Sequence, residues 1–91
     1  MRQLVDDIRK AVSKYKDVFV HDKDSWMERG ESIGKESLCT LTAEGELYHI
    51  LNGNNRPKAN DMTEHKLDDI ARRHGCYIEQ GNSWSWPFYT I

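Results

Sequence analysis

The chain has 91 residues, which is enough for one domain and too few for two. Hydrophobic residues make up 37% and charged residues 31% of the sequence, with three Trp and four Tyr, so we expect a folded domain over residues 1–91. The net charge of −2 at pH 7 argues against a protein that neutralises many phosphates, and it is too small for a nucleic-acid mimic.

The first predicted elements are a helix and a strand pair. Apolar residues lie three and four positions apart from Arg2 to about Tyr15, which predicts a helix with one wide apolar face. Val18-Phe19-Val20 follows as a short run of strand-forming residues. We expect Ser25-Trp26-Met27 to pair with this run as a hairpin, with the polar residues between them as the turn.

A second hairpin is predicted between Ser37 and Leu51. Its first strand alternates up to Thr42, and Ala43-Glu44-Gly45 supplies a turn with a glycine where a left-handed conformation is needed. The return strand, Leu47 to Leu51, carries apolar residues on both faces. That pattern predicts a strand inside the sheet.

A second helix is predicted to begin at Asp61. Asp61 and Glu64, three residues later, form the pattern of an N-cap with a capping box. The apolar spacing continues to His74, and Gly75 is suited to the left-handed conformation that ends a helix.

The segment from Cys76 to Ile91 predicts a third hairpin, with Gly81-Asn82 at its turn. Side chains alternate between the two faces of a strand, so one face should carry three aromatic rings, Trp84, Trp86 and Phe88. Because Pro87 has no N–H to donate, we expect this strand at an edge of the sheet.

These elements predict an α+β fold, with two helices packed on one mixed or antiparallel sheet of about four to six strands, in the order α-β(β)-β-β-α-β-β. Leu4-Val5-Asp6-Asp7-Ile8 is echoed by Lys66-Leu67-Asp68-Asp69-Ile70, and each is followed by a predicted strand and a Ser-Trp pair. If the echo is a repeat and not a coincidence, it predicts two α-β-β units that share one sheet.

The sequence holds no complete catalytic or metal-binding pattern. Gly30 to Glu36 resembles a phosphate-binding loop, but three residues separate its glycines instead of four, and Glu36 replaces the hydroxyl residue. Four side chains could serve as zinc ligands, but only one pair is closely spaced, which favours ordinary buried residues: Cys39, His49, His74 and Cys76. An apolar strand around Cys39 should raise its thiol pKa, which argues against a nucleophile. We expect no enzymatic activity, no metal and no cofactor.

The aromatic C-terminal strand favours protein binding. An edge strand with large aromatic side chains suits strand addition or a dimer contact. The predicted contact residues come from this strand and from the polar loop before the second helix: Trp84, Trp86, Tyr89, Asn54, Asn55, Arg56 and Lys58. We therefore expect a small non-catalytic protein-binding module, such as an inhibitor, an immunity or anti-defence factor or an accessory regulator, with a homodimer through the C-terminal strand as an option.

The alternative is an RNA- or DNA-binding accessory domain. Its phosphate contacts would come from the first helix and the polar loop: Arg9, Lys10, Lys14, Arg56 and Lys58. The order of helix, three strands and helix resembles the double-stranded-RNA-binding fold. The resemblance covers element order alone, because Asp61 and Glu64 open the second helix, where that family carries its basic cluster.

No apolar run approaches the roughly 18 residues of a membrane helix, and the first residues do not resemble a signal peptide. We therefore expect a cytoplasmic protein in which Cys39 and Cys76 are reduced.

Overall fold

The structure is a computed structural model that describes residues 2–30, 36–52 and 63–91. Its helices and strands follow one another as α1 (Arg2–Ala11), β1 (Val18–Asp22), α2 (Lys23–Glu28), β2 (Cys39–Ala43), α3 (Glu46–Leu51), α4 (Thr63–Arg73), β3 (Cys76–Ile78) and β4 (Ser85–Thr90). The four strands form one antiparallel sheet in the order β1-β2-β4-β3. The predicted α+β fold is therefore confirmed. Asp61, the expected start of the second helix, lies outside the described residues.

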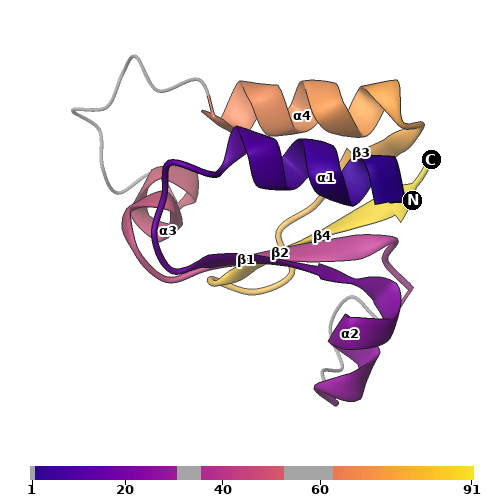
Figure 1. Ribbon diagram of the computed structural model, residues 1–91, viewed down its shortest axis with the longest axis horizontal. Coiled ribbons are helices and arrows are strands. Elements are labelled where there is room, and N and C mark those ends of the chain that lie inside the picture. The colour runs from indigo at the N-terminus through magenta and orange to yellow at the C-terminus, as the bar shows by residue number, and fades with distance from the viewer. Residues whose placement is uncertain (1, 31–35, 53–62) are drawn as a thin grey trace.

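The two long helices lie side by side on one face of the sheet, whereas α2 projects from the other face (Figure 1). The first unit consists of α1, β1 and β2, and the second consists of α4, β3 and β4. Each unit contributes its second strand to the middle of the sheet, where β2 pairs with β4. Two α-β-β units thus share one sheet, which is the architecture that the repeat predicts.

The core lies between the sheet and these two helices. Strand pairing aligns Val20 with Leu41 and Leu41 with Trp86, so one row of apolar side chains crosses three strands. All three are buried beneath the apolar faces of α1 and α4, whose contributions are Leu4, Val5, Ile8, Leu67, Ile70 and Ala71. A hydrogen bond of 3.0 Å between the Tyr15 hydroxyl and the Thr63 hydroxyl joins the segment after α1 in the first unit to the start of α4 in the second. In the described part of the chain, no helix is both long enough and apolar enough to cross a membrane.

The segment predicted as the hairpin partner of the first strand is the short helix α2. Asp22 caps it, because its carboxylate accepts a hydrogen bond of 2.8 Å from the N–H of Ser25. Trp26 is the side chain that α2 buries, at 1% exposure, whereas Met27 is 53% exposed. The polar residues read as a turn therefore serve as a helix cap, and the strand prediction is wrong.

The return strand predicted from Leu47 to Leu51 is also wrong, because this segment forms α3. Leu47 is fully buried, and Ile50 and Leu51 pack beside the core at the three-and-four spacing of one helical face. In a run with so many apolar residues, helical spacing and alternation are both present, and the tertiary packing decides between them.

The C-terminal strand β4 is an interior strand, so the prediction of an edge strand is wrong. On the side of β3, the Pro87 carbonyl accepts a hydrogen bond of 3.0 Å from the Glu79 N–H, and the Pro87 nitrogen faces the same side. Because β3 has already ended at Ile78, the missing N–H faces a connecting segment and interrupts no strand ladder. The homodimer predicted through β4 has no free edge to use.

Candidate functional site

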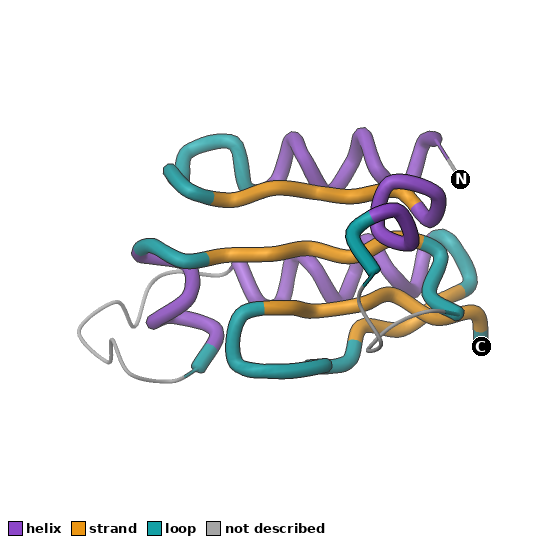
Figure 2. The backbone as a smooth tube through the Cα atoms, turned by 90° about the horizontal axis from the view of Figure 1, so that it is seen from below, coloured by secondary structure: helices purple, strands orange, loops and turns teal. Residues whose placement is uncertain are grey.

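The sheet has two edge strands, β1 and β3, and β1 is the longer of them. It has five residues, whereas β3, at the opposite edge, has three. Figure 2 shows β1 as the outermost strand, with β2 and β4 inside it. Within the described residues, no other strand pairs with the outer side of β1, and an unpaired edge of this length can pair with an added strand.

Strand register identifies which backbone groups of β1 face outward. The Glu44 N–H donates to the Asp17 carbonyl at 3.1 Å, and these two residues lie opposite each other. In an antiparallel pair, every second residue exchanges hydrogen bonds with its partner, so Phe19 also faces β2. The N–H and C=O groups of Val18 and Val20 consequently point away from β2, toward the free edge.

A side chain of α1 occupies part of this edge. The Arg9 Nη2 donates a hydrogen bond of 3.0 Å to the Val20 carbonyl, which confirms that this carbonyl faces away from β2. Guanidinium N–H groups are donors of the same kind as a backbone N–H. Arg9 therefore holds the position that a donor from an added strand would take.

Two hollows flank β1, one on each face of the sheet. The hollow between α1 and β1 has a volume of about 290 Å³ and is lined by Arg9, Val12, Ser13, Tyr15, Val18, Phe19 and Val20. The hollow on the opposite face has a volume of about 270 Å³ and is lined by Asp17, Phe19, Arg29, Thr42, Glu44 and Trp84. Phe19 borders both and is 62% exposed. A single exposed apolar residue is common on protein surfaces, so Phe19 marks this edge only together with the outward-facing backbone and the two hollows.

Phe19 is the exposed end of an aromatic cluster on the face that carries α2. Ring centroids are 6.4 Å apart between Phe19 and His21, 5.5 Å between His21 and Trp26, and 6.2 Å between Trp26 and Trp84. Burial lowers the pKa of His21, and the positive charges of Arg29 and Arg9 lower it further. Both effects favour the neutral form of the imidazole, as suits a ring packed among other rings.

The predicted contact residues of β4 lie in three different environments. Trp86 is 5% exposed and belongs to the core, so its ring is not a surface feature. Tyr89 is half-buried on the opposite face, where its ring lies 5.6 Å from that of Tyr77. Trp84 precedes the strand, and its N–H donates to the Asn82 side chain at 3.2 Å, so the local turn places its ring against Trp26. The expected shared face of Trp84 and Trp86 is therefore wrong. The remaining predicted residues, Asn54, Asn55, Arg56 and Lys58, lie outside the described part of the structure.

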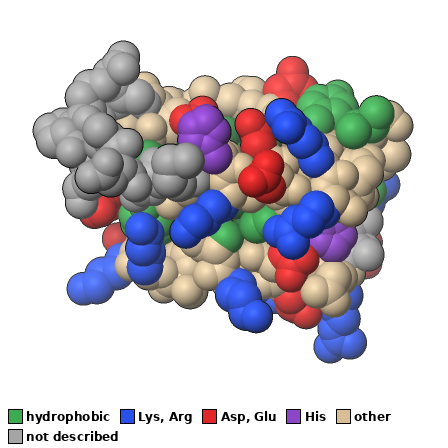
Figure 3. Space-filling model, turned by 90° about the horizontal axis from the view of Figure 1, so that it is seen from above, with side chains coloured by type: hydrophobic (Ala, Val, Ile, Leu, Met, Phe, Trp, Pro, Cys, Tyr) green, Lys and Arg blue, Asp and Glu red, His purple; other side chains and the backbone are tan. Residues whose placement is uncertain are grey.

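The basic residues predicted on the first helix do not share one face. Arg9 reaches the edge of β1, while Lys10 lines a groove of about 420 Å³ between α1 and α4. Lys14 lies beyond the end of α1, with its ammonium 5.1 Å from the centre of the Tyr15 ring. The groove also holds Asp7 and Asp69, and Figure 3 shows both signs of charge interspersed over this face.

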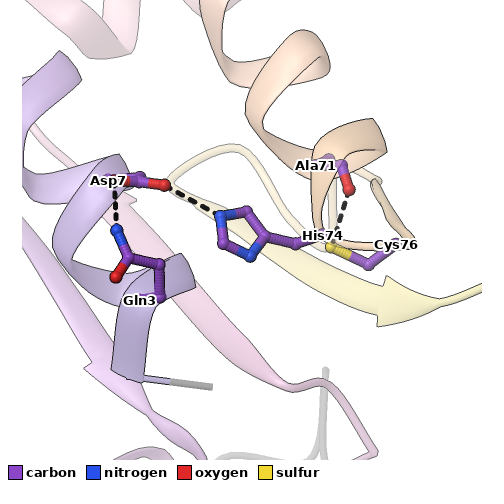
Figure 4. Close-up of polar contacts among 5 residues, drawn as sticks. All are labelled: Gln3, Asp7, Ala71, His74 and Cys76. Atoms are coloured by element: carbon purple, nitrogen blue, oxygen red, sulfur yellow. Dashed lines mark hydrogen bonds and ion pairs between the residues drawn. The ribbon is translucent and has the colours of Figure 1, made fainter.

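Two of the four candidate zinc ligands, His74 and Cys76, have separate hydrogen-bond partners. The His74 Nε2 lies 2.8 Å from the Asp7 carboxylate, and the Cys76 thiol donates to the Ala71 carbonyl at 3.3 Å (Figure 4). Burial raises the pKa of Cys39 to about 12, as the apolar strand predicts, and burial also raises the pKa of Cys76. Among the residues that the structure describes, no three His, Cys, Asp or Glu side chains are placed to hold a metal ion. The resemblance of Gly30 to Glu36 to a phosphate loop falls largely outside the described residues.

The comparisons with known proteins give no family assignment: no protein-family model matches the chain, and no curated protein or solved structure shows a significant match. The function is therefore argued from the site itself.

Sequence reasoning identified the strand Val18-Phe19-Val20 but not its place at the edge. The available signal was Phe19 itself, since it stands between two valines that both face the core and must therefore face away from it. Phe19 is accordingly far more exposed than Trp86 and Phe88 of the C-terminal strand, which are both buried.

Proposed function

We propose that this protein is a non-catalytic binding module that takes up an extended segment of another protein as an additional strand beside β1. The observation that carries the proposal is the free edge of β1, with the outward-facing backbone of Val18 and Val20 between two hollows. Strand addition is an established mode of peptide recognition, in which backbone hydrogen bonds give affinity and alternate side-chain pockets give specificity.

The two hollows match the alternation of an added strand. Successive side chains of the added strand point to opposite faces of the sheet. One set would enter the hollow beneath α1, against Val12, Val18 and Val20, and the other would lie beside the exposed ring of Phe19. Cross-strand neighbours lie roughly 5 Å apart, which is within contact distance of an aromatic ring.

A binding role of this kind covers inhibitors, immunity or anti-defence factors, and accessory regulators. In each of them a small domain acts by occupying a segment of its partner, without chemistry of its own. These three roles differ in which partner segment the domain binds.

The test is a selection of nonapeptides from a random display library with the complete protein as bait. Val18→Pro removes an outward-facing N–H and no N–H of the ladder between β1 and β2, at the cost of strain in the preceding Asp17, whose φ is 58°. We expect it to weaken binding of selected peptides by about tenfold or more, since several backbone hydrogen bonds of roughly 1 kcal/mol each depend on that edge. Ile78→Pro, an equivalent half-buried position on the opposite edge strand β3, is the matched control and should retain binding.

Chemical-shift mapping of the wild-type protein with a selected peptide provides a measurement that needs no variant. Shifts concentrated at Val18, Phe19 and Val20 support the proposal, whereas shifts elsewhere, or equal loss in both proline variants, contradict it. Titration with duplex RNA, duplex DNA and single-stranded RNA at low and physiological salt tests the alternative. Micromolar binding that falls steeply with salt and is lost in Arg56→Ala and Lys58→Ala would favour nucleic acid as the partner.

A further inference from the structure

The hydrogen bond from Arg9 to the Val20 carbonyl is a contact between a helix side chain and a strand edge. It satisfies one edge carbonyl while the edge is unpaired, and an added strand would bring its own N–H to the same carbonyl. Arg9 is an exposed residue, so water can hydrate the released guanidinium, but its N–H groups stay at the rim of the hollow, where a carboxylate of the added strand can accept from them.

We infer that Arg9 is a specificity residue, which selects a partner strand carrying a carboxylate on the side that faces α1. The inference rests on the proposed function and adds the chemistry of the partner. The partner's backbone N–H replaces Arg9 at the Val20 carbonyl, and the released guanidinium pairs with the carboxylate.

On the α1 side of the edge, the charges fit an acidic side chain of the partner. Residues 9–16 carry no acidic side chain, and Arg9 lines the hollow there. Asp17 and Glu44 line the hollow on the opposite face, so the attraction applies to the α1 side alone. The hollow beneath α1 is otherwise lined by apolar and hydroxyl side chains, so Arg9 is the charged group within it. Local potential of one sign attracts and orients a partner of the opposite sign.

The same contact disfavours a second copy of this chain as the occupant. Antiparallel pairing of two β1 strands about Val20 places the two α1 helices on the same face of the joined sheet. Both Arg9 guanidinium groups would then lie close to the symmetry axis, because each is 3.0 Å from its own Val20 carbonyl. Two cations brought together in this way repel each other, whereas one cation and a carboxylate attract.

Strand geometry also gives the pattern of the bound segment. The side chain in the hollow and the side chain beside Arg9 face the same way, so they are two residues apart in the partner. The expected segment is an apolar residue and an Asp or Glu separated by one residue, and the residue between them lies beside Phe19.

The peptide selection with variants of Arg9 tests this inference. Wild-type protein should enrich the apolar and acidic pattern, Arg9→Gln should lose the acidic preference, and Arg9→Glu should replace it with a preference for Lys or Arg. Lys10→Glu changes charge at the adjacent position, which lines the groove between α1 and α4, and should leave the preference unchanged. A synthetic peptide with Glu replaced by Gln should bind wild-type protein about fivefold more weakly, the upper range for an exposed ion pair, and Arg9→Gln protein equally.

The outcomes separate this inference from the proposed function. Peptides that depend on Val18 but show no acidic preference, or a preference that survives Arg9→Gln, overturn the role of Arg9 and leave strand addition in place. If the selection yields no peptide whose binding depends on the β1 edge, both the role of Arg9 and strand addition are overturned.

Discussion

The contact between Asp7 and His74 ties the two α-β-β units together at the level of single side chains. Asp7 lies on α1, His74 follows α4, and their side-chain atoms are 2.8 Å apart. The hydrogen bond from His74 lowers the pKa of Asp7 below its ordinary value of 3.8, against an opposing effect of desolvation. A carboxyl group with a lowered pKa in the folded protein stabilises the fold when it is ionised.

The pH dependence of stability should therefore carry a contribution from Asp7. It is fully present above the unfolded-state pKa of 3.8 and is lost as the pH falls through the lower folded-state pKa. Asp7→Asn should lower the urea midpoint at pH 7 and reduce the loss of stability on acidification below about pH 4. Asp6→Asn, at the exposed neighbouring position, is the control. Equal effects of the two substitutions on urea midpoints across this pH range would exclude a specific role for the pair.

Among the elements, α2 is attached to the sheet chiefly through Trp26. This side chain is 1% exposed and contacts the rings of His21 and Trp84 on the face that α1 and α4 leave uncovered. The Arg29 guanidinium lies 5.4 Å from the centre of the Trp26 ring. A helix of six residues is not stable by itself, so its position depends on this anchor.

Trp26→Ala should therefore destabilise the protein by about 3 kcal/mol, the lower range for truncating a buried Trp. Met27→Ala removes an exposed side chain from the same helix and should change stability by less than about 0.5 kcal/mol. Urea denaturation followed by far-ultraviolet circular dichroism measures both without relying on tryptophan fluorescence. A loss below about 1 kcal/mol for Trp26→Ala would mean that the aromatic cluster contributes little to the fold.

The sequence predicted an element correctly where its hydrophobic pattern fits only one kind of secondary structure. Predictions failed where one segment fits both the helical and the strand pattern. The spacing of Leu4, Val5 and Ile8 fits only a helix, and α1 is there. Leu47, Ile50 and Leu51 satisfy a helical face and also leave apolar residues on both faces of a strand, so contact with the core decides in favour of α3. Pro87 did indicate that one side of β4 lacks a complete hydrogen-bond ladder. The reason is that β3 is short, and not that β4 is an edge strand.

The sequence led to a hypothesis of strand addition at the C-terminal strand, whereas the structure has β1 and β3 at the edges of the sheet. Strand addition at an aromatic edge strand followed from the sequence as a hypothesis, and Arg9 was named as a basic surface residue. Which strand is at the edge depends on how β2 and β4 pair across the two units, and no local pattern encodes that pairing. The bond between Arg9 and Val20 likewise exists only once α1 lies over β1.

At the scale of the whole molecule, the two α-β-β units depend on each other. The buried residues of both form one continuous core, and Phe88 of β4 is aligned with Cys39 of β2 on one side and Ile78 of β3 on the other. A single unit would be a helix on two strands. Its second strand, β2 or β4, would lose the strand with which it pairs in the other unit. Two-stranded sheets of this size are at best marginally stable in water.

Cutting the chain between α3 and α4 tests this dependence. Fragments 1–52 and 53–91 should each lack a cooperative thermal transition, and mixing them should restore both the transition and the far-ultraviolet circular dichroism of the intact chain. A cut inside α4, between Asp68 and Asp69, should prevent restoration because it divides the helix that packs on β3 and on α1. Cooperative unfolding of either fragment by itself would show that one unit is self-sufficient. Because α1 is held over β1 by a core that both units complete, peptide binding at the β1 edge should return on mixing and be undetectable in fragment 1–52.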